Sequence, residues 1–329
     1  MSSKDIQEAM AELADEPTTL MFHAEMEPLV SSLSSEKPSP KSEGGLEVYS
    51  TFLASRPSSY ETCAIEQILS VAHLAPNLPL HIVHLSAVEA IPILRKARAQ
   101  GVKITAETCH HYLSLAAEEV LDGDTRHKCC PPIRSKLNQD GLWEELERHG
   151  TDGVIQTVVS DHSPCTPDLK RLPAHIHGHC ADDPSEGKGN FFSAWGGVSS
   201  VGLGLPILWT ELSRRRALTS NPSDDNTRST LQSIVRLCCG NTAAQVGLQG
   251  QKGDLAVGHD ADICVFDDAA EWEVEPSTML FRNKCSPYQG KKLRGMVRET
   301  WLRGQRIFSR EKGFGADVPV GKLLLPERA

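Results

Sequence analysis

Residues 158–165 (VVSDHSPC) decide the fold, because an apolar run ends there abruptly in polar residues. The valines are followed within four residues by an acid, a histidine and a hydroxyl, and Pro164 then stops regular structure. A buried parallel strand that delivers polar groups to the carboxyl end of an α/β barrel has this pattern. We therefore place Asp161 at a strand end, where such folds keep their chemistry.

Two earlier apolar runs, residues 18–23 and 80–84, end in the same way at His23 and His84. Strand ends of a barrel converge on one axial pocket, so residues distant in sequence can share an ion. Imidazole nitrogen and carboxylate oxygen are both ligands of zinc and related cations. Taken singly, each side chain is better explained as a hydrogen-bonded histidine or a helix-capping aspartate. Three such side chains at the same topological position favour a metal site. In that site Asp161 is also a candidate proton carrier.

Short apolar strands alternate with helical segments, which predicts βα units around a parallel sheet. Residues 102–108 and 154–160 are the third and fourth predicted strands. Apolar residues on one 3.6-residue face predict a helix over 61–75. Ser86 and Glu89 resemble a capping box for the helix that follows the second strand.

The pattern divides the chain into two parts, with a further amphipathic helix predicted over residues 231–246. We expect a partial barrel domain over residues 1–247, with flexible insertions at 31–45 and 171–190. From residue 248 onward, short strands with Gly and Asp turns predict a small β domain that continues to residue 329.

Composition excludes some classes of partner. The net charge is −9 without a basic block, which disfavours nucleic acid and anionic membrane as partners. Residues 1–17 lack the apolar core of a signal peptide, and residues 201–209, the longest apolar stretch, are too short to span a bilayer. The ten cysteines contain no Cys-x-x-Cys pair. We therefore expect a cytoplasmic protein with reduced thiols.

Three further stretches are rich in groups that bind metals or ligands. Residues 108–112 (TCHHY) follow the third strand and are expected to face the same pocket mouth. We expect one of the two histidines in this stretch to have a structural role. Residues 128–134 (KCCPPIR) form either a rigid loop with room for a ligand or an ordinary proline-rich turn. His175, His177 and His179 lie in a polar segment broken by Pro and Gly, which we interpret as a surface insertion that binds metal only adventitiously.

Together these motifs make the chain resemble the allantoinases of the cyclic amidohydrolase group, relatives of dihydroorotase and hydantoinase. The Asp-His-Ser-Pro-Cys and Ser-Pro-Tyr elements favour allantoinase within that group. The resemblance covers residues 21–25, 83–86, 129–134, 160–165, 194–197, 284–288 and 302–304.

The resemblance implies a (β/α)8 barrel with two divalent ions, usually zinc. In that family the ligands are a His-x-His pair on strand one, a carboxylated lysine on strand four, histidines on strands five and six, and an aspartate on strand eight. His23, His84 and Asp161 match the last three. The implied reaction is attack of a bridging hydroxide on the hydantoin ring of allantoin, giving allantoate in purine and ureide catabolism. Asp161 would be the general base and then the acid, and Cys130 and Ser163 would line the substrate pocket.

The chain departs from this family pattern before His23, where neither a strand-borne His-x-His nor a bridging lysine occurs. We therefore expect an N-terminally truncated protein: the C-terminal half of the barrel (strands 5–8) plus a small C-terminal β domain. An incomplete set of zinc ligands predicts weak metal binding and little turnover by the chain alone.

Two alternatives remain open. One is another cyclic amidohydrolase, a hydantoinase or dihydroorotase, that acts on a related cyclic ureide. The other is a non-catalytic half-barrel that binds a full-length paralogue through its open sheet edges. In the enzyme reading the partner is a small-molecule substrate, and we expect a homo-oligomer.

Overall fold

The computed structural model describes residues 3–28, 44–148, 153–176, 188–219, 226–315 and 319–324. Contacts divide the chain into two compact units. The first unit consists of Met1–Val201 and Leu280–Tyr288, and the second of Gly202–Met279 and Gln289–Ala329.

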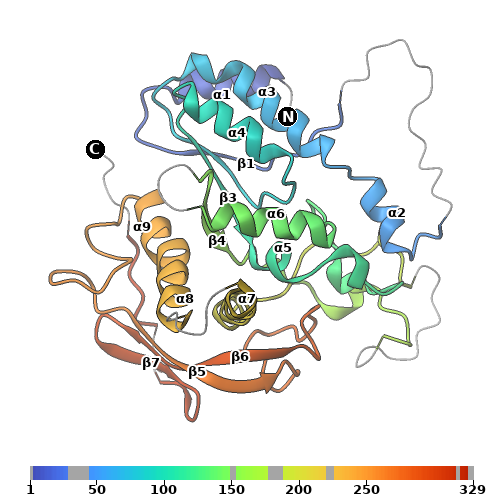
Figure 1. The fold of residues 1–329 in the computed structure, drawn as a ribbon, viewed down its shortest axis with the longest axis vertical. Helices are drawn as coiled ribbons and strands as arrows, with labels where there is room; N and C mark the ends of the chain where they lie inside the picture. Colours follow the sequence, from blue (N-terminus) through green and yellow to red (C-terminus); the bar gives the residue numbers. More distant parts are fainter. Residues whose placement is uncertain are drawn as a thin grey trace. The chain divides into compact units, whose positions relative to one another are not determined.

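The first unit is built on a parallel sheet whose strands lie in their order along the chain, β1-β2-β3-β4 (Figure 1). Leu20 of β1 pairs with Leu80 of β2, which in turn pairs with Ile104 of β3. A register shift interrupts β3 at Ala106/Glu107, beyond which it pairs with β4 up to its last residue. The strands are β1 (Leu20–Phe22), β2 (Leu80–Ile82), β3 (Ile104–Cys109) and β4 (Ile155–Val159).

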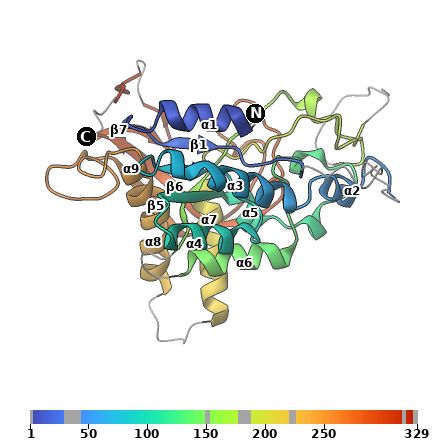
Figure 2. The ribbon, with the colours of Figure 1, turned by 90° about the horizontal axis from the view of Figure 1, so that it is seen from above.

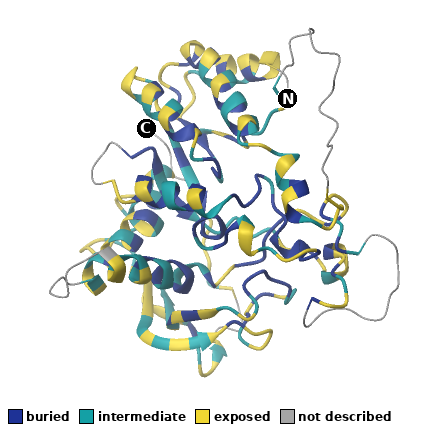
Figure 3. Ribbon diagram, turned by 45° about the vertical axis from the view of Figure 1, so that its right-hand side comes forward, coloured by how far each residue is buried: buried dark blue, intermediate teal, exposed yellow. Residues whose placement is uncertain are grey.

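Helices α3 and α4 of the first unit lie side by side (Figure 2), and the helices of this unit carry buried residues on one side and exposed residues on the other (Figure 3). Ile65 and Ile68 of α3 are buried, as is Leu94 of α4, which packs on β3. β2 is buried at every position, as expected of a central parallel strand. The helices are α1 (Ser3–Glu12), α2 (Tyr49–Ala54), α3 (Ser59–Val71), α4 (Ala90–Ala99), α5 (His110–Ser114) and α6 (Lys136–Leu146), with 3-10 turns at Ala72–Leu74, Ala117–Glu119, Thr125–His127 and Pro167–Lys170.

All four predicted strands form, but β1, β2 and β4 end before the polar residues that were expected to close them. The chain leaves the extended conformation there, and both His84 (φ 42°) and Asp161 (φ 41°) adopt left-handed backbone. The side chains of interest therefore lie on the loops just beyond the sheet.

The predicted capping box is wrong. α4 begins at Ala90, and Glu89 at its N-cap makes no capping hydrogen bond. The Ser86 hydroxyl instead donates to the Pro132 carbonyl oxygen at 2.7 Å, which ties the loop after β2 to the proline-rich loop.

The second unit carries an antiparallel sheet in the order β5-β6-β7-β8, and α7 packs on β6 (Figure 1). Gly295 has φ 88°, and a Cβ there would lie 2.2 Å from the Phe266 ring, so only glycine fits this approach. The predicted helix over 231–246 forms in three pieces, because a π-helical turn separates α8 from α9. The elements are α7 (Gly204–Thr219), α8 (Asn226–Val235), the π-helix (Arg236–Gly240), α9 (Asn241–Gln245), β5 (Ile263–Glu273), β6 (Lys292–Leu302), β7 (Gln305–Ser309) and β8 (Gly313–Phe314).

The compact units follow a different division from the one expected at residues 247/248. Contacts place α7 to α9 with the C-terminal sheet, because the apolar side chains of α7 pack on β6. Of the two expected insertions, most of 31–45 and the central part of 171–190 lie outside the described residues. Within the described ranges, no helix has the length and apolar character needed to cross a membrane.

Candidate active site

Polar side chains follow the carboxyl ends of β1, β2 and β4 in the first unit. His23 comes directly after β1, and His84 and Asp161 each lie two residues beyond their strand. Left-handed backbone at a non-glycine residue is uncommon, and such strain gathers at functional sites. Its occurrence at both His84 and Asp161 marks these two loops as candidates.

His23 and His84, which we call the histidine pair, are in direct contact. His23 Nδ1 lies 2.9 Å from His84 Nε2, and the rings meet edge to face with centroids 4.7 Å apart. On its other side His23 Nε2 lies 3.1 Å from Glu25 Oε2. A carboxylate only accepts, so in a neutral His23 ring the hydrogen is on Nε2 and the Nδ1 lone pair faces His84. This tautomer leaves His23 ready to bind a cation.

Arg56 holds the carboxylate that orients His23. Its Nη1 donates to Glu25 Oε2 at 2.8 Å. Burial raises the pKa of Glu25, but the hydrogen bond from His23 and the charge of Arg56 outweigh it, so the pKa lies below its ordinary value. Glu25 is thus an ionised, nearly buried anchor for the histidine pair.

Asp161 and His84 influence one another electrostatically. Burial raises the pKa of Asp161 above its ordinary value, although the neighbouring His84 opposes the shift. Burial and the second imidazole at His23 lower the pKa of His84. His84 is therefore neutral near pH 7, the form in which an imidazole binds metal.

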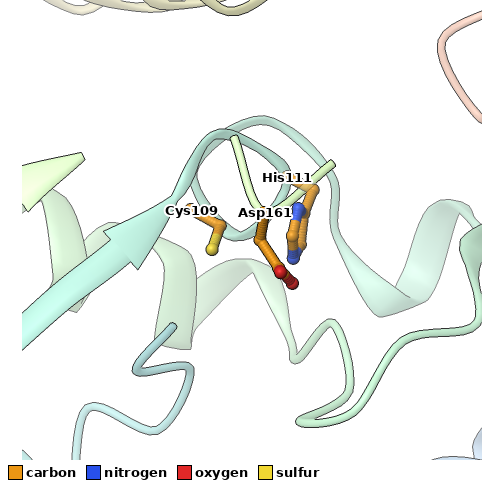
Figure 4. Close-up of side chains that lie close together, drawn as sticks. All are labelled: Cys109, His111 and Asp161. Atoms are coloured by element: carbon orange, nitrogen blue, oxygen red, sulfur yellow. The ribbon is translucent and has the colours of Figure 1, made fainter. Parts of the chain in front are cut away.

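Asp161 lies closest to a different set of potential ligands. Ligand atoms of Cys109, His111 and Asp161 all fall within 4.8 Å of one another (Figure 4). His23, His84 and Asp161 do not form such a group among the described residues. We name Cys109, His111 and Asp161 the thiol cluster. The sequence placed residues 108–112 at the pocket mouth, but it did not single out Cys109 and His111 as ligands.

Cys130 and Ser163 lie on loops that meet at Gly196 and Gly197. A Cβ at Gly196 would lie 3.8 Å from Cys130 Sγ, and one at Gly197 only 2.5 Å from the Ser163 carbonyl oxygen. Ser163 Oγ donates to the Asp161 carbonyl oxygen at 3.3 Å and to its Oδ1 at 3.5 Å. Ser163 therefore restrains Asp161, while Cys130 stays partly accessible in the same neighbourhood.

Glu61 is a structural anchor of the site that sequence reasoning missed. Its buried carboxylate accepts from the backbone N–H groups of Ser86 (2.8 Å) and Ala87 (3.1 Å) and from Arg134 Nη2 (2.7 Å). Burial raises the pKa of Glu61, although the Arg134 charge acts in the opposite direction. Glu61 thereby joins the loop after His84 to the proline-rich loop. Nothing in local sequence signals contacts over such separations.

Unpartnered atoms around these loops fit a cation. Among the described residues, His84 Nδ1, Glu25 Oε1 and both ring nitrogens of His111 are buried without a hydrogen-bond partner. Buried polar atoms normally have partners, and neutral imidazole with carboxylate and thiolate suits a transition-metal ion. The donor set therefore fits the divalent metal that the sequence predicts.

Of the surface histidines, His175 Nε2 lies 3.2 Å from the Asp122 carbonyl oxygen and is exposed. His177 and His179 lie outside the described residues. His162 accepts from the backbone N–H groups of Ser200 (2.9 Å) and Val201 (3.0 Å), which gives it a structural role in its loop.

Comparison with known proteins shows what the chain is similar to. A profile described as "Amidohydrolase family" matches residues 208–308. Allantoinase from Saccharomyces cerevisiae is 44% identical over 325 residues, which are 98% of this chain and 62% of that protein. Allantoinase from Streptomyces avermitilis is 40% identical over 319 residues, 97% of this chain and 61% of that protein. The chain is thus similar, over nearly its whole length, to curated allantoinases.

A solved structure has a similar fold. L-hydantoinase (dihydropyrimidinase) from Arthrobacter aurescens superposes with a TM-score of 0.76 at 24% identity, over 96% of this chain and 62% of that one. The chain thus spans about three fifths of the length of the relatives it matches. The expected N-terminal truncation stays a prediction.

Proposed function

We propose that this chain belongs to an allantoinase-type hydrolase, which opens the hydantoin ring of allantoin to allantoate in purine and ureide catabolism. The observation that carries the proposal is the placement of His23, His84 and Asp161 just beyond three strands of one parallel sheet. Two relatives named allantoinase, at 44% and 40% identity, support this substrate over other cyclic amides.

Within this proposal, β1 to β4 correspond to strands five to eight of a (β/α)8 barrel, and the second unit to the C-terminal part of a small β domain. Sequential parallel order supports that assignment, since adjacent strands of such a barrel follow one another along the chain. Similarity to a hydantoinase fold at a TM-score of 0.76 is consistent with it.

Zinc is the metal we propose, with His23, His84 and Asp161 as its ligands in this chain. When bound, such an ion acts as a Lewis acid on a carbonyl oxygen of the substrate. The chain's own contribution is orientation: Arg56 fixes Glu25, and Glu25 fixes the tautomer of His23. His84, whose pKa is lowered by burial and by the neighbouring His23, presents a neutral imidazole to the ion.

Asp161 is the proposed proton carrier. Its carboxylate takes up a proton from the attacking water and returns it to the ring nitrogen that leaves. Ser163 keeps that carboxylate in place by hydrogen bonds to Oδ1 and to the backbone of Asp161. Cys130 and Ser163 lie on adjoining loops and would contact the substrate there.

Location and assembly belong to the same proposal. The nine cysteines among the described residues are free thiols, which supports a reducing, cytoplasmic location. We also predict that the chain forms a homo-oligomer. Besides the metal, its predicted ligand is a small-molecule substrate.

The test is zinc content and turnover of the purified chain, measured with allantoin, hydantoin and dihydroorotate side by side at saturating zinc. We expect weak zinc binding and allantoate as the product that forms. Turnover of hydantoin or dihydroorotate without allantoin would favour the alternative amidohydrolases. A folded chain with neither bound zinc nor any turnover, which elutes in complex with a full-length relative, would instead support the non-catalytic half-barrel.

A further inference from the structure

We propose that Cys109, His111 and Asp161, the thiol cluster, form a second cation site for a thiophilic divalent ion such as zinc or cobalt. The site lies beside the histidine pair. It rests on the proposed function only through Asp161, which is a ligand in both. Its chemistry differs, because the histidine pair offers nitrogen and the thiol cluster adds a sulfur ligand.

Backbone pairing brings the three residues together. Cys109 is the last residue of β3 and pairs with Val159, the last residue of β4, so Asp161 follows on the neighbouring loop. His111 is the second residue of α5, the short helix that begins directly after β3. Figure 4 shows Asp161 between the other two side chains in this view, with its carboxylate beside the His111 ring. Three ligand atoms within 4.8 Å of one another can surround a single ion after small side-chain rotations.

His111 supplies an independent observation that points to a ligand. The residue is 0% exposed, and neither of its ring nitrogens has a hydrogen-bond partner among the described residues. Its ring packs edge to face on Tyr112 with centroids 4.2 Å apart, which satisfies its apolar edges but no nitrogen. An unpaired buried polar group costs about 1–3 kcal/mol, so a bound cation would remove a real penalty.

A cysteine nucleophile with a histidine base is the competing explanation for these residue types. Such a pair requires a hydrogen bond between the base and its partners. Neither His111 nitrogen makes one, to Cys109 or to Asp161. Cys109 is also 0% exposed, whereas a nucleophile must reach its substrate. Coordination explains the cluster better than covalent catalysis.

The ligand types select the ion. Thiolate and imidazole favour zinc, cobalt and cadmium, and disfavour magnesium and calcium, which prefer oxygen. Binding displaces the thiol proton of Cys109 to solvent, since the thiolate is the ligand. Three protein ligands leave one position of a tetrahedral ion open.

Cobalt(II) titration of the full chain tests the proposal, because a thiolate ligand gives a charge-transfer absorption in the near ultraviolet that nitrogen and oxygen ligands do not. We expect the band in the unchanged chain, its loss in Cys109→Ser, and an apparent cobalt affinity about 10-fold lower or worse in His111→Gln. Cys129→Ser is the matched control: its thiol is also buried, 2% exposed, but lies outside the cluster, so the band should persist.

Circular dichroism establishes that each variant is folded, and Cys109→Ala replaces Cys109→Ser if the latter is not. The absence of the band in the folded, unchanged chain would overturn the proposal, as would its persistence without the Cys109 thiol. His23→Gln separates the two hypotheses. It should remove allantoin turnover and keep the band, so failure of the proposed function alone leaves the cobalt result intact.

Discussion

The two compact units each contain a short-range ion pair, but in very different surroundings. In the first unit, Glu61 and Arg134 pair at 2.7 Å with side chains only 1% and 8% exposed. In the second unit, Asp267 and Arg298 pair at 2.6 Å, but 35% and 47% of these side chains are exposed. The N–O distances of the two pairs are thus nearly equal, but their exposure differs. Removal of one partner leaves an unpaired buried charge only in the buried pair, where it destabilises the fold.

The two units also differ in what matches the family profile. That profile matches residues 208–308, most of which belong to the second unit. The histidine pair, Asp161 and the thiol cluster all belong to the first unit. Similarity to the allantoinases extends over both units, since it covers 98% of this chain, so the candidate ligands lie within the matched region.

Asp161→Asn should have the largest effect. In any preparation that hydrolyses allantoin, losing the proton carrier should lower kcat by about 10²–10⁴-fold. A steady-state assay of allantoate formation measures this, with Asp267→Asn as the matched control in the second sheet. Equal activity of the two variants would remove Asp161 from the chemistry.

Glu61→Ala should destabilise the fold more than any other of these substitutions. It leaves Arg134 buried without its partner and frees the N–H groups of Ser86 and Ala87, at an expected cost of about 3–5 kcal/mol. Urea unfolding followed by circular dichroism gives the change in free energy. A loss below about 1 kcal/mol would show that the loop after β2 is held by other contacts.

Asp124 should make stability depend on acid. Burial raises its pKa, but hydrogen bonds from Arg126 and His127 outweigh burial and depress it well below the ordinary value of about 3.9. Its stabilisation, about 1.5–3 kcal/mol for a charged hydrogen bond, is therefore present above that value and is lost as pH falls through the folded-state pKa. The free energies of unfolding of the chain and of Asp124→Asn should differ most at pH 7, and the difference should shrink progressively as pH falls below about 4. A constant difference would contradict this assignment.

Glu25→Gln should weaken zinc binding about 10-fold, because the amide no longer fixes the His23 tautomer as a carboxylate does. Isothermal titration with zinc measures the affinity, and Glu27→Gln in the same segment is the matched control. Partial recovery in Glu25→Asp would support positioning by charge. Unchanged affinity in Glu25→Gln would show that His23 is oriented by His84 alone.

Arg298→Ala should have the smallest effect, with a melting temperature that does not change measurably. Its partner Asp267 is solvated, and exposed ion pairs contribute little to stability. Thermal unfolding at low and high salt checks this. A large salt-dependent drop would contradict the contrast between the buried and the exposed ion pair.

Local pattern predicted the sheet of the first unit well, since buried runs such as residues 80–82 and 155–159 have few other conformations available. It extended the second and fourth strands too far, to His84 and Ser160, because the chain turns at left-handed His84 and Asp161 just beyond the observed strand ends. The capping box failed for a tertiary reason, as the Ser86 hydroxyl is used by Pro132.

The sequence predicted only those site residues that directly follow a recognisable strand. His23 and His84 were expected together and do touch. Cys109 and His111 join Asp161 through the β3–β4 register, which shifts at Ala106/Glu107, and no spacing in the chain signals such a shift.

Left-handed backbone at His84 and Asp161 also restricts which substitutions these positions tolerate. Outside glycine, that conformation is richest in asparagine, aspartate and histidine, whose short polar side chains bond locally. Two of these three types bind metals, so the loop geometry and the chemistry select overlapping residues. The substitutions that this backbone tolerates therefore include metal-binding residues. Valine or isoleucine would strain the main chain at either position, whatever its effect on activity.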